Sequence, residues 1–366
     1  MAVTEDTPPG YRAAIIGTGF MGRVHAHAVL AAGGEVTGVL GSAPDRARTA
    51  AGGLRARHVY TTMDELLSDD TVDVVHVCTP NASHERYTLA ALEAGRHVVC
   101  EKPLSVDADS AARMVDMASR AGRIGTVPFA YRFHPMVRQA RAMVRAGELG
   151  TVTLAHGGYL QDWLTGADDD NWRVDPRQGG RTRAFADIGS HWCDLLEFVT
   201  GDRISTVCAR LTTVNPTRRG QSVATEDIVT LQFATVAGVV GTGVISQVSP
   251  GRKNRLHLEV SGSAASVHFD QEQPETLWLG GRDRNTLLTR EPDALAPDAA
   301  RLAVVPAGHP QGYQDCFNAF TVDTAAAIIG DAPDGLPTFA DGLRAARLTE
   351  AVLTSAEQGG WVGVPA

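Results

Sequence analysis

The chain has 366 residues, of which 43% are hydrophobic and 20% charged, a composition that suits a globular enzyme of two domains. Its formal net charge of −9 argues against nucleic acid or an anionic membrane as a main partner, because both favour clustered lysine and arginine. No apolar run is long enough to span a bilayer, and five scattered cysteines without a C-x-x-C pair indicate reduced thiols, a cytoplasmic location and no metal site.

The first ten residues, MAVTEDTPPG, lack the basic and apolar regions of a signal peptide. We expect residues 1–10 to form a disordered tail.

A glycine motif near the amino terminus organises the first half of the chain. Four small apolar residues at 13–16 predict a buried strand, which runs into Gly17, Gly19 and Gly22 and then into a helix over 23–32. Between a strand and a helix, the spacing G-x-G-x-x-G is typical of dinucleotide binding: the glycines allow a tight turn, approach of a pyrophosphate and close helix packing. The alternative is a glycine-rich turn that binds no ligand. The position of the glycines between a strand and a helix makes this alternative less favoured.

The choice between NAD and NADP depends on the end of the second strand, predicted over 35–40. An acidic residue there would bind the ribose 2′-hydroxyl and repel a 2′-phosphate. Instead Gly41 and Ser42 follow, with Arg46 a few residues on. Arg46 could bind a phosphate or be a solvated residue of the helix over 45–51, so the sequence leaves the choice open.

Strands and helices then alternate, which predicts a parallel sheet covered on both faces. Strands over 72–78 and 97–100 end in Thr79-Pro80-Asn81 and Glu101-Lys102-Pro103, where a Rossmann sheet forms its ligand crevice. The remaining predicted elements of this half are helices over 63–67, 84–94 and 108–121 and a strand over 124–127.

The predicted strands of the second half are longer and alternate between hydrophobic and polar residues. This pattern predicts an open, mostly antiparallel sheet. These strands are expected over 151–160, 206–213, 227–233, 238–247, 256–261 and 265–269. The expected helices cover 136–146, 187–200, 313–329 and 340–357. We therefore predict an α/β chain with a Rossmann domain at 11–129 and an α+β domain at 130–366 for substrate binding and oligomerisation, whose last helices can pack back on the Rossmann domain.

These motifs together resemble one family. The glycine loop, Thr79-Pro-Asn81 with His84, Glu101-Lys-Pro103, the segment 131–135 and Asp187-Ile-Gly-Ser-His191 are ordered as in the Gfo/Idh/MocA superfamily of NAD(P)-dependent sugar and cyclitol oxidoreductases. The chain departs from many members at Gly41-Ser42, where they carry an aspartate. The resemblance implies a homodimer or homotetramer formed through the C-terminal sheet.

The resemblance also implies a set of cofactor-binding residues, all in the first 102 positions. They are Gly17, Gly19, Phe20, Met21, Gly22, Gly41, Ser42, Arg46, Thr79, Pro80, Asn81, His84, Glu101 and Lys102.

Lys102 is the first catalytic candidate. At a strand's carboxyl end, its ammonium could hydrogen-bond a substrate hydroxyl and favour the developing alkoxide. The alternative is a structural ion pair with Glu101 or another carboxylate, and the resemblance favours catalysis. Pro103 resembles the family's cis-proline.

Asp187 and His191 are the other two catalytic candidates. At i and i+4 they would project from one face of a helix, and histidine can take a hydroxyl proton as hydride leaves the same carbon. The alternative is a capping aspartate and a satisfied core histidine. Asp194, one turn further on, is expected to orient other groups or bind substrate.

Substrate-side candidates mix aromatic faces with hydrogen-bonding groups, as sugar sites do. Beside Asp187 and His191 they are Tyr131, Arg132, Trp163, Trp172 and Arg173. The two tryptophans and Arg173 could equally pack in an interface. The run Asp168–Asp170 is expected to be a solvated loop.

The function favoured by these observations is hydride transfer between NAD(P) and a secondary carbinol of a sugar, glycoside or cyclitol, with His191 as general acid/base and Lys102 polarising the hydroxyl. A redox-neutral epimerase would instead retain its cofactor and release no reduced nicotinamide. A non-catalytic, dinucleotide-dependent regulator would not need Lys102, Asp187 and His191 together.

Overall fold

The structure, a computed structural model, describes residues 11–366, so the tail expected at residues 1–10 lies outside the described residues. The described chain forms two compact units. The first holds residues 11–130 and 313–343, and the second holds residues 131–312 and 344–366.

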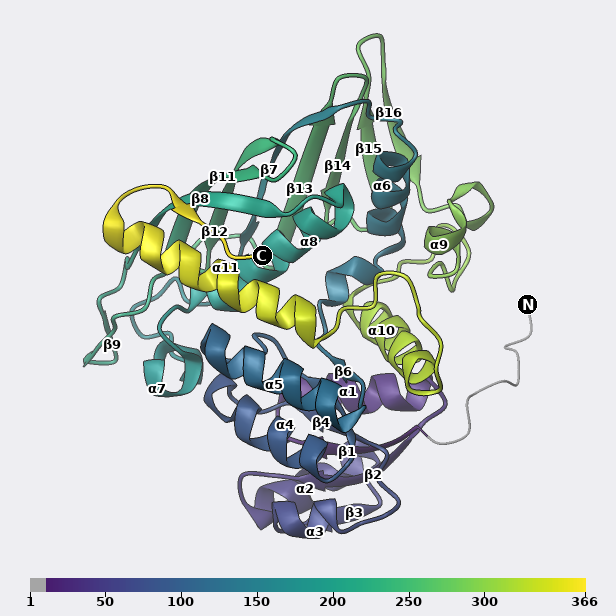
Figure 1. Cartoon of the computed structure of the whole chain (residues 1–366), viewed down its shortest axis with the longest axis vertical. Helices are drawn as coiled ribbons and strands as arrows, with labels where there is room; N and C mark the ends of the chain where they lie inside the picture. Colours follow the sequence, from purple (N-terminus) through teal and green to yellow (C-terminus); the bar gives the residue numbers. More distant parts are fainter. Residues whose placement is uncertain (1–10) are drawn as a thin grey trace. The chain divides into compact units, whose positions relative to one another are not determined.

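The first unit is built on a six-stranded parallel sheet with the order β3-β2-β1-β4-β5-β6 (Figure 1). Its strands are β1 (Arg12–Ile16), β2 (Glu35–Leu40), β3 (His58–Tyr60), β4 (Val74–Val77), β5 (His97–Cys100) and β6 (Gly125–Thr126). The strand order reverses direction between β1 and β4, which creates a crevice at the carboxyl ends of these strands. The predicted parallel Rossmann sheet is confirmed.

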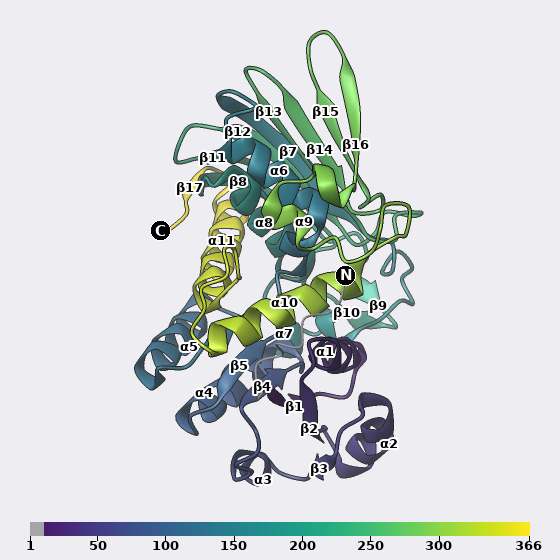
Figure 2. The same cartoon turned by 90° about the vertical axis from the view of Figure 1, so that its right-hand side faces the viewer.

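Helices cover both faces of this sheet, with α4 and α5 on one side and α1 and α10 on the other (Figure 2). They are α1 (Phe20–Ala31), α2 (Pro44–Leu54), α3 (Met63–Leu67), α4 (His84–Glu93), α5 (Ala108–Ala121) and α10 (Tyr313–Ile328). Helix α10 returns from late in the sequence to pack on α1, where Gln314 Nε2 donates to the carbonyl oxygen of Val24 at 3.1 Å.

The second unit contains a nine-stranded sheet with the order β16-β15-β14-β13-β7-β12-β11-β8-β17. All neighbours are antiparallel except β12 and β7, which run parallel. The strands are β7 (Val152–Leu160), β8 (Ile204–Thr212), β11 (Ile228–Thr235), β12 (Val240–Ser246), β13 (Arg255–Gly262), β14 (Ser266–Asp270), β15 (Thr276–Gly280), β16 (Asn285–Thr289) and β17 (Val362–Gly363), with a separate hairpin of β9 (Thr217–Arg218) and β10 (Gln221–Ser222). The predicted large, mostly antiparallel sheet is confirmed.

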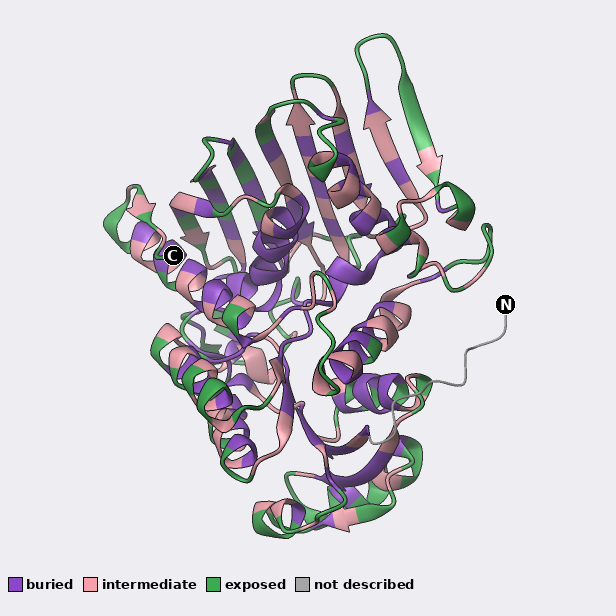
Figure 3. Cartoon of the chain, turned by 45° about the vertical axis from the view of Figure 1, so that its right-hand side comes forward, coloured by how far each residue is buried: buried purple, intermediate pink, exposed green. Residues whose placement is uncertain are grey.

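One face of this sheet is covered by helices and the other is not (Figure 3). The helices of the unit are α6 (Pro135–Arg145), α7 (Pro176–Gly179), α8 (Ser190–Thr200), α9 (Pro297–Ala300) and residues 344–358 of α11 (Phe339–Gln358). Helix α8 packs closely because its buried Trp192 lies over Gly157 and Gly243, where an added Cβ would come within 2.9 Å of the indole. Trp192 Nε1 also donates to the carbonyl oxygen of His257 at 2.9 Å.

Several features differ from the sequence-based expectations, among them the following three. Helix α1 begins at Phe20, three residues earlier than expected. The start was placed too late because Gly22 lies in the first turn, and glycine has a low helix propensity. The edge strands β15 and β16 were not expected, since β16 is largely exposed and lacks an apolar face. The helix expected over 187–200 begins earlier, with a π-helical turn at Phe185–Gly189.

Candidate active site

The three glycines that follow β1 have different structural reasons to be glycine. Gly17 has φ +114°, and an added Cβ would lie 2.3 Å from the carbonyl oxygen of Cys78. A Cβ on Gly22 would lie 2.2 Å from the carbonyl oxygen of Gly17. Gly19 has a negative φ and no described atom within 4 Å of an added Cβ. The fold therefore requires Gly17 and Gly22, whereas Gly19 leaves room beside the backbone for a ligand.

The surroundings of Gly19 suit an anionic ligand. Gly19 is the N-cap residue of α1, and no side chain of the described chain caps this helix end. The first N–H groups of a helix lack intrahelical partners and lie at the positive end of its dipole. An open glycine at such a position fits the pyrophosphate of a dinucleotide.

An open cavity of about 530 Å³ lies beside α2, the helix that follows β2. Thr18, Arg23, Arg46 and Thr49 line it, and both arginines are exposed. Asp45 also lines the cavity, where its carboxylate pairs with Arg48 at 2.5 Å. The exposure of Arg46 is compatible with a phosphate contact and with a solvated helix residue alike.

A buried histidine connects the loops that follow β4 and β5. His84 Nε2 lies 2.8 Å from the carbonyl oxygen of Thr79, and His84 Nδ1 lies 2.9 Å from that of Pro103. Burial lowers the pKa of His84. The ring therefore ties the Thr79-Pro80-Asn81 loop to the Glu101-Lys102-Pro103 loop.

The Glu101-Lys102-Pro103 turn contains the cis peptide bond that the resemblance implies, between Lys102 and Pro103. Glu101 is buried, and its carboxylate lies 2.9 Å from His25 Nε2 and accepts the backbone N–H of Lys102 at 3.1 Å. Burial would raise the pKa of Glu101, but the His25 hydrogen bond and the electrostatic effects of His25, Lys102 and His84 outweigh it and lower the pKa.

In the second unit, Asp187 lies in the π-helical turn and does not cap a helix. Its Oδ1 accepts from Arg173 Nε at 3.1 Å, and its Oδ2 accepts from Gln247 Nε2 at 2.8 Å. The structure thus brings together Asp187 and Arg173, and the Arg173 guanidinium lies over the Trp172 ring at 4.3 Å. The capping alternative for Asp187 is wrong.

His191 follows the π-helical turn and is 6% exposed. Its ring meets the ring of Tyr131 edge to face, with centroids 4.9 Å apart. The Tyr131 hydroxyl is hydrogen-bonded to that of Tyr159, and both hydroxyls contact Asn254. The sequence did not identify Tyr159 and Asn254 as candidate site residues, because neither belongs to a motif.

The same polar cluster continues to Trp163. Gln161 Nε2 donates to Asn254 Oδ1 at 2.8 Å, and Trp163 Nε1 donates to Gln161 Oε1 at 2.7 Å. Trp163 also packs against the buried side chains of Leu164, Val174 and Val223.

Arg132 and Asp194 form a buried ion pair. Arg132 Nε donates to Asp194 Oδ2 at 2.8 Å, and the second guanidinium nitrogen bonds the other oxygen. Both residues are less than 10% exposed, and the Arg132 guanidinium also lies 5.1 Å from the Phe198 ring centroid. Asp194 therefore orients Arg132, which agrees with the orienting role expected for it.

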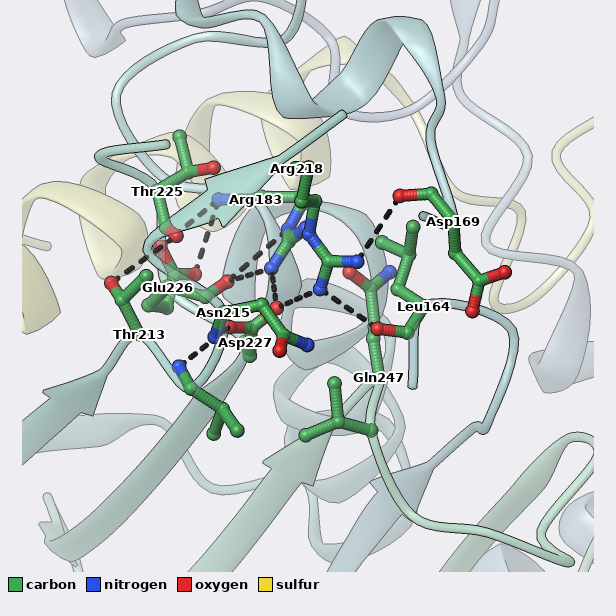
Figure 4. Close-up of polar contacts among 12 residues, drawn as sticks. Leu164, Asp169, Arg183, Thr213, Asn215, Arg218, Thr225, Glu226, Asp227 and Gln247 are labelled. Carbon is green, nitrogen blue, oxygen red and sulfur yellow. Dashed lines mark hydrogen bonds and ion pairs between the residues drawn. The ribbon is translucent and has the colours of Figure 1, made fainter. Parts of the chain in front are cut away.

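A second buried ionic network supports the segment that carries Asp187 (Figure 4). Asp227 is fully buried and accepts from two guanidinium groups, those of Arg183 and Arg218, and from the backbone N–H groups of Val214 and Asn215. Burial would raise the pKa of Asp227, but the N–H of Asn215 and both guanidiniums outweigh it and lower the pKa.

This network is linked to Asp187 by two routes. The Glu226 carboxylate accepts the backbone N–H groups of Arg183 and Phe185, which fixes the start of the π-helical turn. The backbone N–H of Gln247 donates to the carbonyl oxygen of Asp227, and the Gln247 side chain reaches Asp187. Gln247 was missed because nothing in the sequence distinguishes it from other strand-end polar residues.

The candidate residues are thus divided between the two units. All of the cofactor-binding candidates belong to the first unit, and the substrate-side candidates with Asp187 and His191 belong to the second. Within residues 11–366, no group of three or more histidine, cysteine, aspartate or glutamate side chains could hold a metal ion. No helix in this range is long and apolar enough to cross a membrane.

A Rossmann unit with an open glycine loop, followed by an α+β unit with a large open sheet, defines the chain as a two-domain, dinucleotide-dependent oxidoreductase. Residues 11–129 match the profile described as "Oxidoreductase family, NAD-binding Rossmann fold", and residues 137–268 match the "GFO/IDH/MocA C-terminal domain". The chain belongs to the Gfo/Idh/MocA family, and it is an NAD(P)-dependent dehydrogenase or reductase acting on CH–OH groups.

Known proteins and solved structures resemble the chain over nearly its whole length. Levoglucosan dehydrogenase from Pseudarthrobacter phenanthrenivorans is 29% identical, covering 96% of this chain and 97% of that protein. A levoglucosan dehydrogenase complex with NADH and levoglucosan has a TM-score of 0.91 at 27% identity, covering 98% and 100% of the two chains. An oxidoreductase domain protein from Kribbella flavida has a TM-score of 0.91 at 32% identity, with the same coverage. An inositol dehydrogenase homolog from Azotobacter vinelandii, complexed with NAD+, has a TM-score of 0.89 at 28% identity, covering 97% of each chain.

The geometry of the glycine loop predicts that Gly19→Val abolishes binding of NAD and NADP while the fold survives. An added Cβ at this position has no described atom within 4 Å, so the valine side chain would extend into the space beside the helix end. Calorimetric titration with both cofactors measures the loss. Gly52→Val, in the exposed part of α2, is the control and keeps both affinities. Unchanged affinity in Gly19→Val would remove the loop from the cofactor site.

The buried network predicts different effects for two neighbouring arginines. Arg218→Ala leaves Asp227 with one guanidinium and should lower the free energy of unfolding by about 3–5 kcal/mol, as expected for a broken buried ion pair. Arg219→Ala removes exposed contacts, a hydrogen bond from Nε to the carbonyl oxygen of Asp168 at 2.9 Å and an ion pair with Asp170 at 3.9 Å, and should cost about 1 kcal/mol or less. Urea unfolding of the two variants measures the difference, and equal costs would contradict the supporting role of the network.

Proposed function

We propose that the chain transfers a hydride between NAD(P) and a secondary carbinol carbon of a sugar, glycoside or cyclitol. The observation that carries this proposal is the arrangement at the start of α8. There, a buried histidine packs on a tyrosine and follows a turn whose aspartate is held by Arg173 and Gln247. The related proteins named for levoglucosan and inositol support this substrate class.

His191 is the general acid/base in this proposal. Imidazole titrates near neutral pH, so it can take the hydroxyl proton during oxidation and return it during reduction. The edge-to-face contact with Tyr131 limits rotation of the ring. Asp187 has both carboxylate oxygens engaged, so its orientation is fixed four residues before the base, and its negative charge would favour the imidazolium.

Lys102 is the polarising group. Its ammonium stabilises negative charge as the hydroxyl oxygen becomes an alkoxide, and its backbone is fixed by Glu101 and by the following cis peptide bond. The glycine loop, the residues after β2 and the Thr79-Pro80-Asn81 loop would hold the cofactor, whose nicotinamide supplies or accepts the hydride.

Substrate binding is assigned to the aromatic and polar groups near Asp187 and His191. Tyr131, Trp163 and Trp172 offer ring faces to the C–H patches of a sugar, and Arg173 offers N–H donors to its hydroxyls. Arg132 would contribute from its ion pair with Asp194. A panel of sugars and cyclitols, tested with both cofactors by absorbance of reduced nicotinamide, identifies the substrate and the direction.

The uncovered sheet face supports a homodimer or homotetramer. On the adjacent strands β7 and β12, Leu154 pairs with Val240, and Val244 lies on the same face of β12, two pleat repeats further along. All three side chains are exposed, at 39%, 54% and 43%. An exposed apolar patch on a sheet is typical of an association surface.

If His191 and Lys102 act on the same hydroxyl, each alanine variant should reduce the rate of hydride transfer by two to four powers of ten, roughly the usual contribution of a proton carrier or a charge donor. The double variant should lose less than the product of the two factors. The parent's oxidation rate should rise with pH through one ionisation, because only the deprotonated base accepts a proton, and His191→Ala should abolish this dependence. Stopped-flow measurement across pH tests all three expectations.

His156→Ala is the control for these variants, since His156 is a half-exposed residue of β7. It should keep the parental rate and pH profile. Cofactor affinity should change little in His191→Ala and weaken somewhat in Lys102→Ala. A parental rate and profile in His191→Ala would make Asp187 the next candidate for the base.

The residues after β2 predict that Gly41→Asp shifts preference from NADP toward NAD, because a carboxylate repels the 2′-phosphate. A Cβ at this position would lie 3.1 Å from Ala47 and 3.2 Å from Thr18, so the substitution also has a steric cost. Gly41→Ala carries that cost without the charge and is the matched control. Dissociation constants of both cofactors measure the shift, and an Asp variant that binds NADP as the Ala variant does would contradict the assignment.

A further inference from the structure

Four buried titratable side chains of the first unit form a continuous hydrogen-bonded chain. Tyr11 Oη lies 2.9 Å from His76 Nε2, and His76 Nδ1 lies 2.8 Å from His25 Nδ1. His25 Nε2 lies 2.9 Å from Glu101 Oε1. None of the four residues is more than 4% exposed. The proposed mechanism uses neither histidine, so the chain requires its own explanation.

The four residues come from separate elements of the Rossmann unit. Tyr11 precedes β1, His25 lies in α1, His76 lies in β4, and Glu101 follows β5. The chain therefore runs from the amino end of one strand to the carboxyl end of another. Phe317 of α10 covers His25, with ring centroids 5.3 Å apart.

We propose that His25 and His76 are positioning residues, which hold the Glu101 carboxylate in one place and one charge state against the backbone of Lys102. This inference rests on the proposed role of Lys102 as the polarising group. To stabilise an alkoxide, Lys102 needs a fixed backbone and a constant charge nearby. Glu101 fixes the backbone by accepting the Lys102 N–H, and its carboxylate provides the constant charge as long as it stays ionised.

The geometry permits one order of protons when both imidazoles are neutral. An ionised Glu101 can only accept, so His25 carries its proton on Nε2. His25 Nδ1 then has a lone pair, and His76 must donate to it from Nδ1. His76 Nε2 is left as an acceptor, and the Tyr11 hydroxyl donates to it. Every hydrogen bond therefore points toward Glu101, and bonds aligned in this way strengthen one another.

The charge states agree with this order. Burial raises the pKa of Tyr11 and lowers the pKa of His76 well below its usual value. The pKa of Glu101 is lowered by its contact with His25, against the effect of burial. At neutral pH the chain thus contains a neutral tyrosine, a neutral His76 and a carboxylate.

Other titratable groups face Glu101 from the neighbouring elements. They are Cys78 after β4, Cys100 of β5, His84 of α4 and Lys102. Burial raises the pKa of both thiols, so they are uncharged near neutral pH. Burial lowers the pKa of His84, against the effect of its two carbonyl partners, which favour the protonated ring. Among the described residues, His25, Lys102 and His84 are the groups that lower the pKa of Glu101.

Nitrogen NMR of the full-length protein, labelled with ¹⁵N-histidine, tests the proton order without any assay of activity. We expect His25 to be neutral and protonated at Nε2, and His76 to be neutral and protonated at Nδ1. Tyr11→Phe removes one oxygen and preserves the packing, and both tautomers should persist because Glu101 sets the order. A charged His25, or a His76 protonated at Nε2 in either protein, would overturn the proposal.

Carboxyl-carbon NMR of protein labelled with ¹³C-glutamate tests the effect on Glu101, with Glu101→Gln to assign the signal. His25→Leu removes the donor and should move the Glu101 titration to higher pH. His25→Gln, whose amide can still donate, should restore most of the shift. His27→Leu is the matched control, because His27 lies exposed on the same helix, and it should leave the titration unchanged.

Hydride-transfer rates connect this chain to catalysis. His25→Leu should slow the step by about tenfold or more, the usual effect of losing a residue that positions another, and His25→Gln should recover most of the rate. A titration shift without a change in rate would overturn the positioning role. By contrast, a parental rate in Lys102→Ala would overturn the proposed function of Lys102 and leave the proton order intact, so the two failures are distinguishable.

Discussion

A buried carboxylate must be met by hydrogen-bond donors, and this requirement organises both units. In the first unit, Glu101 is met by His25, 76 positions earlier in the sequence, and by the backbone of Lys102. In the second, Asp227 is met by Arg183, 44 positions earlier, and by Arg218. Each carboxylate thereby joins a loop at a strand end to elements from distant parts of the chain. Removing one donor would leave a charge in a dry interior, so these contacts constrain the loops on which the candidate site residues lie.

The same reasoning distinguishes residues that serve the fold from residues that serve a ligand. Gly17 and Gly22 are explained by the carbonyl oxygens of Cys78 and Gly17, so a ligand is not needed to account for them. Gly19 has no such neighbour, and its openness is explained only by something outside the described chain that approaches the helix end. A glycine without a structural reason is thus more informative about function than the complete motif, because two of its three glycines would be present in an unliganded turn of this shape.

The sequence predicted features that local chemistry determines. The parallel sheet follows from apolar strands that alternate with helices, and the large second sheet follows from alternating hydrophobicity. The cis bond at Lys102-Pro103 came from the family resemblance, not from composition. Contacts between distant residues were not predictable. Nothing near Asn254 or Gln247 indicates that one contacts the Tyr131 and Tyr159 hydroxyls and that the other binds Asp187. The His25–His76 contact was equally hidden, because each histidine lies in an apolar stretch where a satisfied core role is the ordinary expectation.

The spacing of Asp187 and His191 predicted one face of a regular helix, but Asp187 lies in a π-helical turn. The turn is held by a bond from the Ser190 N–H to the Phe185 carbonyl, and the Ser190 hydroxyl donates to the Ala186 carbonyl at 2.8 Å. A Cβ on Gly189 would lie 2.5 Å from the Phe185 ring, so this position requires glycine. Gly189-Ser190 was therefore a sequence signal of the wider turn, and it was missed. Such turns are rare and less stable than α-helix, and they often occur at functional sites. Here Glu226 compensates by binding the Arg183 and Phe185 N–H groups, so a buried carboxylate stabilises the irregular backbone that precedes the candidate base.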